Sequence, residues 1–455
     1  MAGGIPKSLL SADLIPSIGG LKRIRNSLLP VSGGGAYTPE ASNKIVFQLP
    51  SFENSVLVPE NSYLRFNFKT NANTTRCFRN SVNFIKRVVI RNSRGQIIED
   101  IDSYMTWNKI NDVLKKTRCD LRGESQTTRA PYTQDMAKRF ADEANYATGD
   151  GVPVIHHLNS GFIGSKHQKF YIPISSLMSS SGFALHIELH LADAKDVVYS
   201  TNGSSATYSI PEIVYETEML EMSPDTYRDI YGELMKGKQL AIPFKSVRAH
   251  VLQMNGQQSF NHKIVESAHD AINAYAVVRE NKAGLTNVAD VNAVVSDDDP
   301  NTFYGGGKKW IANQEVGTDS VHLTKYVWKT NHSYMPNVPV EMPGQKTLAL
   351  QNNISMLGLK NPFVGETLEG ASYLCSEFEA RDFIVATTFK KTNDPGLHNG
   401  SNFSASSSPI QLDLEFSGTV NTKELCCFIE SQNVLYLRGN GESSTIKAQV
   451  LFLCV

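Results

Sequence analysis

The sequence predicts an all-β protein made of two tandem antiparallel β-sandwiches, with a few short helices in loops and in the linker between them. Short segments that alternate apolar and polar residues recur along the chain, and no repeating strand–helix–strand rhythm connects them. The clearest alternations are Ile45–Leu49, Tyr63–Phe68, Phe183–Leu191 and Ile410–Phe416. One helical pattern near the middle of the chain divides these segments into two blocks of roughly 200 residues each.

The bulk composition is that of globular domains. Of the 455 residues, 41% are hydrophobic and 20% are charged, so the chain can bury real cores. Its 44 Lys and Arg residues against 45 Asp and Glu residues give a net charge of -1. A protein whose main task is to coat nucleic acid carries a strong basic excess, which this chain lacks.

Residues 1–40 are expected to be an N-terminal arm. The first 35 residues are rich in glycine and contain one acid, Asp13, against basic residues that include Lys7, Lys22, Arg23 and Arg25. A tail of this kind tends to stay mobile until something binds it. Weak contact with a genome, an inner membrane or a neighbouring subunit is one interpretation, and a disordered tail without a role is the other.

Residues 41–222 are predicted to form the first sandwich. Alternation begins at Lys44, and a β-hairpin is expected between Phe84 and Ile98 with its turn at Asn92–Gly95. The other elements expected here are helices at Asp102–Lys116 and Asp135–Tyr146 and strands at Lys169–Ile174, Phe183–Leu191 and Glu212–Leu220.

A helical linker is predicted at residues 223–238, where Ser223 suits the N-cap, Pro224 the first helical position and Gly237 the stop. Residues 239–455 are then the second sandwich, with a first strand at Phe244–Leu252 and a long, mixed, loop-rich region at Val265–Val340. Later strands are expected at Thr347–Leu350, Asp382–Ala386, Ile410–Phe416, Leu425–Leu437 and Ile446–Val455, the last one buried because a free tail would be polar.

The two blocks share a pattern near their ends. Leu185–Leu189 in the first corresponds to Ile410–Leu414 in the second. Each is followed, after a polar loop, by a longer strand, Glu212–Leu220 and Leu425–Leu437 respectively. The match is one of pattern and position, so duplication of a single sandwich plan is a hypothesis.

Several segments resemble the first jelly roll of double jelly-roll major capsid proteins, most closely those of polinton-like viruses and virophages. They are Val56–Phe66, the hairpin Ile85–Ile98, and Lys169–Leu177 followed by Leu185–Leu191. The segment Tyr208–Met235 is similar to the passage between the two jelly rolls of that group. The resemblance covers most of residues 40–455 and lies in the order of the elements.

The resemblance implies a double jelly roll that serves as a viral structural protein, the major capsid protein of a DNA virus. Three chains would form a homotrimer with a pseudo-hexagonal outline, and such trimers would tile an icosahedral capsid together with penton and minor or cement proteins. The expected location is the virion, after synthesis inside the host cell without secretion, because no apolar signal-peptide core is visible. The alternatives are a minor capsid or vertex protein of the same virus type, and a two-domain β-sandwich that binds carbohydrate or is cupin-like.

The best candidate for a catalytic metal site is the trio His186, Glu188 and His190. On a strand these side chains share one face, so two imidazoles and a carboxylate could meet a metal ion, as in cupin-like barrels. The opposite face, which includes Leu185 and Leu189, is the expected core side. The histidines are therefore expected on an outer or subunit-facing surface, and a polar strand face is the favoured interpretation.

The remaining candidates are weaker. His156–His157 has no nearby acid, Gly305–Lys309 lacks the spacing of a phosphate loop, and Asp297–Asp299 lacks the glycine turn and the final Glu of an EF-hand. Adjacent Cys426 and Cys427 would point to opposite faces of a strand, which disfavours a shared metal or a disulfide. We therefore predict no enzyme, no catalytic, cofactor-binding or metal-binding residue, and no cofactor.

Overall fold

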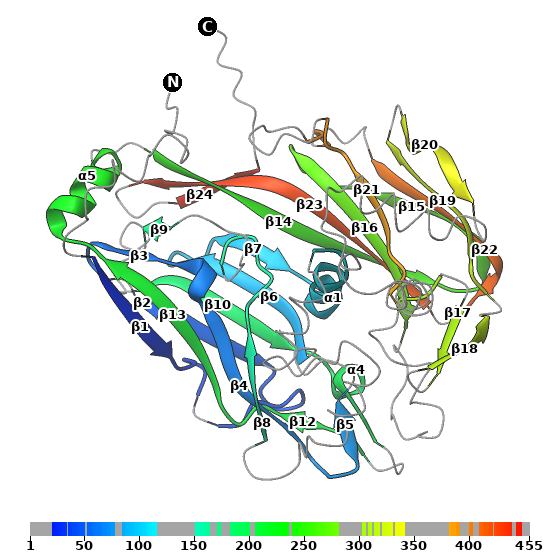
Figure 1. Ribbon diagram of the computed structural model, residues 1–455, viewed down its shortest axis with the longest axis horizontal. Coiled ribbons are helices and arrows are strands. Elements are labelled where there is room, and N and C mark those ends of the chain that lie inside the picture. The colour runs from blue at the N-terminus through cyan, green and yellow to red at the C-terminus, as the bar shows by residue number, and fades with distance from the viewer. Residues whose placement is uncertain are drawn as a thin grey trace, which may run out of the picture.

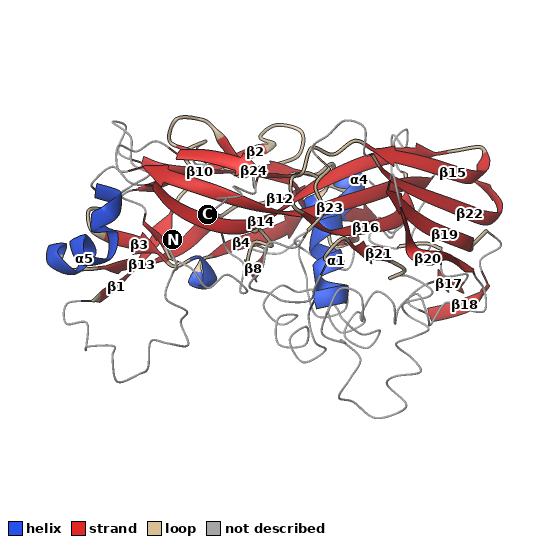
Figure 2. Cartoon of the chain, turned by 90° about the horizontal axis from the view of Figure 1, so that it is seen from above, coloured by secondary structure: helices blue, strands red, loops and turns tan. Residues whose placement is uncertain are grey.

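The structure is a computed structural model that describes residues 21–33, 35–50, 52–77, 84–115, 151–163, 171–173, 183–200, 205–235, 239–281, 303–305, 308–311, 314–318, 321–330, 333–341, 382–391, 400–403, 409–421, 423–438 and 443–447. Figure 1 shows two groups of strands joined by a helix, α5, at one end of the molecule. Strands dominate both groups in the second view as well (Figure 2). The predicted all-β fold with two tandem antiparallel sandwiches is confirmed.

The first sandwich packs a seven-stranded sheet against a four-stranded sheet. Its elements are β1 (Lys22–Leu28), β2 (Lys44–Pro50), β3 (Ser55–Leu57), a 3-10 turn (Pro59–Asn61), β4 (Tyr63–Thr70), β5 (Thr75–Cys77), β6 (Ile85–Asn92), β7 (Ile97–Ile101), α1 (Tyr104–Lys115), β8 (Val152–His156), β9 (Ile172–Pro173), β10 (Phe183–Leu191), α4 (Ala194–Val197), β11 (Val198–Ser200), β12 (Tyr208–Ser209) and β13 (Ile213–Glu221). The larger sheet has the order β12–β4–β13–β3–β9, with β1 on β13 and β8 on β4, and the smaller sheet has the order β2–β10–β6–β7.

The second sandwich follows α5 (Pro224–Met235) and packs a five-stranded sheet against a four-stranded sheet. Its strands are β14 (Gln239–Met254), β15 (Gln257–Ile264), β16 (Ala271–Glu280), β17 (Lys308–Ile311), β18 (Gln314–Thr318), β19 (Leu323–Thr330), β20 (Ser333–Glu341), β21 (Val385–Thr388), β22 (Ile410–Val420), β23 (Lys423–Arg438) and β24 (Ser443–Lys447). The larger sheet has the order β14–β23–β16–β21, with β24 on β23, and the smaller sheet has the order β15–β22–β19–β20.

Both sandwiches follow one strand plan. The opening strand pairs with the closing strand, β1 with β13 and β14 with β23. The second strand pairs with the next long strand from the end, β2 with β10 and β15 with β22. This inward-wrapped antiparallel order is that of a jelly roll. It places Leu185–Leu189 on β10 and Ile410–Leu414 on the equivalent strand β22, as the duplication hypothesis expects.

Local sequence explains most of these elements. On β2 the alternating residues Ile45, Phe47 and Leu49 are fully buried, because a strand turns every second side chain toward the core. The hairpin of β6 and β7 turns at Gly95, whose φ of 82° suits a residue without Cβ. Helix α5 begins at Pro224 as predicted, and the hydroxyl of Ser223 accepts a hydrogen bond from the backbone N–H of Thr226 at 3.2 Å.

Two expectations were wrong. Lys22–Leu28, expected in a mobile arm, is β1, the opening strand of the first sandwich. The region Val265–Val340, expected to be loop-rich, contains β16, β17, β18, β19 and most of β20 in its described part. The alternation is absent from β16 because eight of its residues in a row, Ala271–Val278, are buried on both faces of the sheet.

Some predicted elements lie outside the described residues. They are the helix Asp135–Tyr146, the strand Thr347–Leu350, half of Lys169–Ile174 and most of Ile446–Val455.

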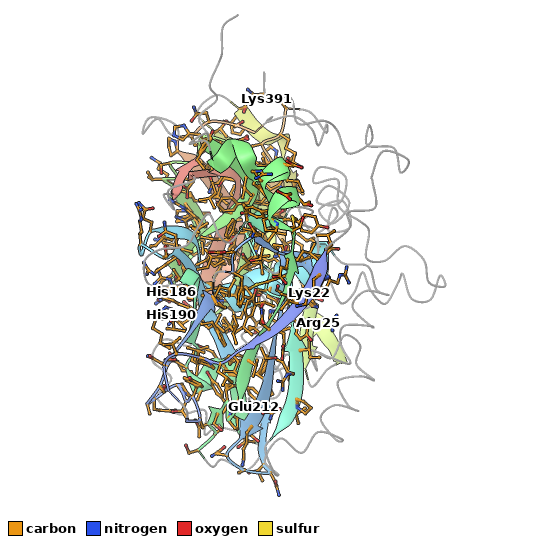
Figure 3. All side chains as sticks on the ribbon, turned by 90° about the vertical axis from the view of Figure 1, so that its left-hand side faces the viewer. Lys22, Arg25, His186, His190, Glu212 and Lys391 are labelled. Atoms are coloured by element: carbon orange, nitrogen blue, oxygen red, sulfur yellow. The ribbon has the colours of Figure 1, made fainter. Side chains whose placement is uncertain are left out.

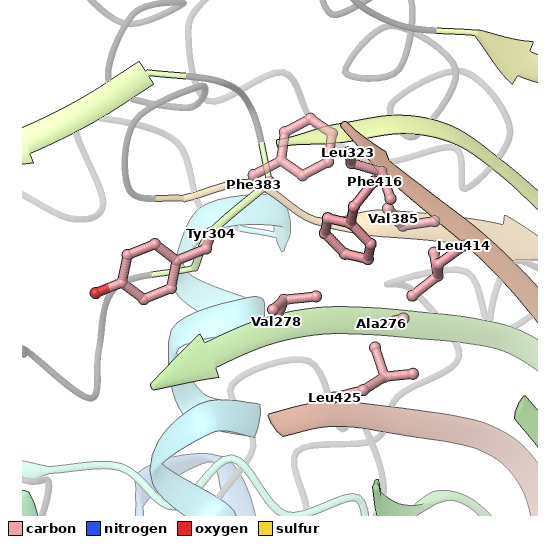
Figure 4. A pocket seen from close by; sticks show the side chains of 10 residues that line it. Ala276, Val278, Tyr304, Leu323, Phe383, Val385, Leu414, Phe416 and Leu425 are labelled. Carbon is pink, nitrogen blue, oxygen red and sulfur yellow. The ribbon is translucent and has the colours of Figure 1, made fainter. Parts of the chain in front are cut away.

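A cavity of about 10 Å³ lies in the core of the second sandwich (Figure 4). Its labelled lining is apolar apart from the hydroxyl of Tyr304, and includes Leu323, Phe383, Leu414 and Phe416. A space of this size holds one water molecule at most, so it is a packing defect rather than a ligand site.

Candidate assembly surfaces

His186, Glu188 and His190 lie on the outer face of β10, where Glu188 forms ion pairs with neighbouring basic residues. His186 and His190 lie on the same side of the strand, as Figure 3 shows. Glu188 between them is 7% exposed and is held by Lys44 Nζ at 3.0 Å and Arg91 Nε at 3.2 Å. The carboxylate that a metal would need is therefore already bound by two cations.

The electrostatics of this face follow from that arrangement. Burial alone would raise the pKa of Glu188, but Lys44 and Arg91 outweigh it and lower that pKa. Burial lowers the pKa of His186 and of His190 below the ordinary value, and Lys44 adds to the effect for both imidazoles. Within the described residues no group of three or more His, Cys, Asp or Glu is placed to hold a metal ion. The described contacts of this face include the ion pairs of Glu188 with Lys44 and Arg91.

The other candidate sites from the sequence lie in different parts of the molecule. His156 is buried, and its Nε2 lies 2.8 Å from the hydroxyl of Tyr104, so it has a structural contact inside the first sandwich. Gly305 has a φ of 126° and packs beside Phe383 rather than opening a helix. Cys426 and Cys427 enter different hydrophobic clusters, as their adjacency on a strand requires. Asp297–Asp299 and Lys7 lie outside the described residues.

Lys22, Arg23 and Arg25, expected in the arm, lie instead on β1. Arg23 and Arg25 each lie 3.5 Å from the carboxylate of Glu218, and Lys22 lies 3.8 Å from Glu221. The side chain of Glu218 is 2% exposed, whereas those of both arginines are at least 70% exposed. The strand was missed in the sequence because Asn26 interrupts its inward row, between Ile24 and Leu28.

The seam between the sandwiches is built by α1 and the segment after β8. The indole ring of Trp107 lies 5.7 Å from the rings of both Tyr275 and Phe428, which belong to the second sandwich. Phe162 meets Phe244 at 5.4 Å in the same seam. One hydrophobic cluster therefore runs from the first sandwich into the larger sheet of the second.

Polar contacts fix the position of the same seam. Lys109 Nζ lies 2.7 Å from Asp382, and Arg279 donates to the hydroxyl of Thr106 at 2.7 Å. Gly161 approaches the backbone of Lys245 so closely that an added Cβ would lie 1.3 Å from its carbonyl oxygen. These contacts were not predicted from the sequence, because they join elements far apart in the chain.

A buried carboxylate lies beside this seam. Glu99 is 2% exposed and accepts hydrogen bonds from the hydroxyl of Ser160 and from the backbone N–H groups of Gly161 and Phe162. Burial raises the pKa of Glu99 to about 7, although these donors favour the charged form. The seam therefore contains a titratable group near neutral pH.

Large apolar side chains are also exposed at the ends of the molecule. Leu29 and Val31, which follow β1, are 71% and 57% exposed, and Tyr334 of β20 is 53% exposed. Beside β20 lies a groove of about 530 Å³, lined by Tyr334 together with Lys325, Lys329, Asp413 and Glu415 among others. Among the described helices none is long and apolar enough to cross a bilayer.

Comparison with known proteins gives matches in structure alone. No family profile matches the sequence, and no curated protein matches it. The PBCV-1 protein Vp54, in its crystal structure fitted into a reconstruction of the virophage Sputnik, matches with a TM-score of 0.62 at 12% identity, over 94% of this chain and 97% of that chain. A chain of the cryo-EM structure of the Sputnik virophage matches with a TM-score of 0.58 at 10% identity, over 100% and 95%.

A third match is the mavirus major capsid protein, with a TM-score of 0.50 at 11% identity, over 95% of this chain and 90% of that chain. At identities this low, the TM-scores establish a shared fold and nothing more. The coverage shows that the whole double sandwich is shared. The chain has the double jelly-roll fold that these three chains share.

Proposed function

We propose that the protein is the major capsid protein of an icosahedral DNA virus and that it acts by self-association as a homotrimer. The observation that carries the proposal is the pair of equivalent jelly rolls joined by one continuous hydrophobic cluster. Three such chains supply six similar sandwiches, which is the number that a pseudo-hexagonal tile needs. End-to-end structural similarity to capsid chains supports the same conclusion.

A structural role rather than catalysis fits the candidate sites. The strand face at His186, Glu188 and His190 is an internally paired network, and the apolar cavity in the second sandwich is too small for a substrate. We infer that the working location is the virion, after synthesis inside the host cell. Penton and minor or cement proteins would complete the shell at positions where trimers cannot.

Solution mass is the direct test. The chain has a mass of 50.2 kDa, so a trimer has about three times that mass. Light scattering coupled to size exclusion should give the trimer, and negative-stain images should show hexagonal outlines. A folded protein that remains monomeric at micromolar concentration and forms no such particles would refute the proposal.

A further inference from the structure

The contact between the two sandwiches of one chain defines a repeatable docking geometry. The opening strand of the second sandwich, β14, lies against β7, the outermost strand of the smaller sheet of the first. In the shared strand plan, β1 is the equivalent of β14, because each pairs with its closing strand. The equivalent of β7 is β20, because each ends the smaller sheet of its sandwich.

The equivalent strands β1 and β20 do not meet within the chain. Figure 1 and Figure 2 show them at opposite ends of the molecule. Among the described strands, β1 pairs with β13 alone and β20 with β19 alone, so both are sheet edges. An uncovered sheet edge is a ready surface for association, and proteins usually cover or blunt it.

Side chains at both edges have the chemistry of an interface. Exposed Leu29 and Val31 continue β1, and exposed Tyr334 stands on β20. Single exposed apolar residues are ordinary and also occur elsewhere on the described surface, as at Ile230 and Val265, but these lie on or next to the two strands that the internal repeat singles out. Partly exposed tyrosines beside polar groups are also a common anchor of protein interfaces.

The sheet edge at β20 has a bulge with a groove beside it. Tyr326 pairs with Val340, and Trp328 pairs with Met335, so the four residues 336–339 on β20 stand opposite Val327 alone. This bulge borders the groove whose rim carries Lys325 and Glu415, charges of both signs. The outer face of β1 presents the exposed arginines Arg23 and Arg25 beside the buried carboxylate of Glu218. These exposed arginines are complementary in charge to the carboxylate of Glu415 in the groove.

We propose that β1 of one copy docks against β20 and its groove on a second copy. The contact repeats between chains the geometry of β14 on β7 within the chain. Each copy then offers a different surface at each end, and such head-to-tail contacts close into a ring when the rotation permits. The inference rests on the proposed homotrimer and names the two surfaces that would form it.

The test replaces exposed apolar residues at one edge. In the full chain, Leu29→Asp combined with Val31→Asp should abolish the trimer and leave a folded monomer by light scattering and circular dichroism, because both side chains are mostly exposed. The matched control is Val265→Asp. Val265 is 76% exposed and follows β15, at the opposite edge of its sheet from β20, so this variant should remain trimeric.

The opposite edge gives an independent variant. Tyr334→Ala should weaken trimerisation by about tenfold or more without unfolding the chain, since the side chain is half exposed. Trimers of wild-type affinity in both the β1 and the Tyr334 variants would overturn the docking surfaces and leave the proposed function intact. A wild-type protein that never trimerises would instead overturn the proposed function itself.

A measurement on the unmodified protein covers the case in which a variant fails to fold. Amide hydrogen exchange of the wild-type protein is compared between the trimer and the monomer obtained by dilution. Peptides that cover β1 and β20 should gain protection on assembly, whereas those that cover β15 should not. Equal exchange of β1 and β20 in the two states would refute the docking.

Discussion

Replacing Trp107 by alanine tests whether the seam makes the two sandwiches one cooperative unit. Trp107 is 5% exposed, and its ring contacts Tyr275 and Phe428 across the seam. Truncating a buried aromatic side chain costs about 3–5 kcal/mol of unfolding free energy. Here the upper end, about 5 kcal/mol, is expected, because two ring contacts are lost and the carbonyl of Asn159 loses its indole donor.

The assay is urea unfolding followed by tryptophan fluorescence and circular dichroism. Measuring at two protein concentrations separates any contribution of association, since assembly stabilises by mass action. Trp107→Phe is the matched control, because it keeps a ring in the seam, and it should cost about 1–2 kcal/mol. We also expect unfolding of the alanine variant to split into two transitions, one for each sandwich. A single transition with a loss below about 1 kcal/mol would show that the coupling of the two sandwiches does not depend on Trp107.

Three further predictions concern single sites. Because the folded pKa of Glu99 is raised to about 7 from 4.5, the folded state binds the proton more tightly, so unfolding free energy should fall by about 3 kcal/mol as pH rises between these values. Glu99→Gln should flatten that pH dependence, and a profile unchanged from wild type in urea titrations would contradict it. Gly161→Ala should cost about 3 kcal/mol or more, because its Cβ would overlap a backbone carbonyl of the second sandwich, whereas Gly35→Ala, with open space around it, should be neutral in thermal melts. The double variant His186→Ala/His190→Ala should keep its assembly state, and elemental analysis should find no bound metal in wild type; stoichiometric metal, lost in the variant, would revive the metal-site interpretation.

Alternation of apolar and polar residues predicted the strands that have one buried and one solvent-exposed face. β2 and β4, the described part of β10, and β22 over Ile410–Phe416 show a buried side chain at every second position, and each strand was located within a few residues. The linker helix was equally readable, because Ser223 and Pro224 are local signals that act through the backbone of the same turn. Interactions between residues close in sequence were enough to predict these elements.

The sequence-based predictions failed for strands and contacts that depend on residues far away in the chain. β16 is buried on both faces, so its sequence has no alternation to detect. β1 has a polar Asn26 in its inward row, and its basic residues are neutralised by Glu218 and Glu221, which lie nearly 200 positions away. The seam depends on Trp107 meeting a sheet encoded more than 160 positions later, a distance over which no sequence period carries information.

The pairing of opening and closing strands has a consequence for biosynthesis. Lys22 pairs with Glu221, and Gln239 pairs with Arg438, so each sandwich closes across 199 positions (221 minus 22, and 438 minus 239). At a ribosomal rate of about 5–20 residues per second, β1 is synthesised about 10–40 s before its partner strand β13. Until then its edge and the apolar side chains beside it remain available to other nascent chains. Because such distant pairings also form slowly, the nascent chain depends most on chaperones during the interval before each closing strand emerges.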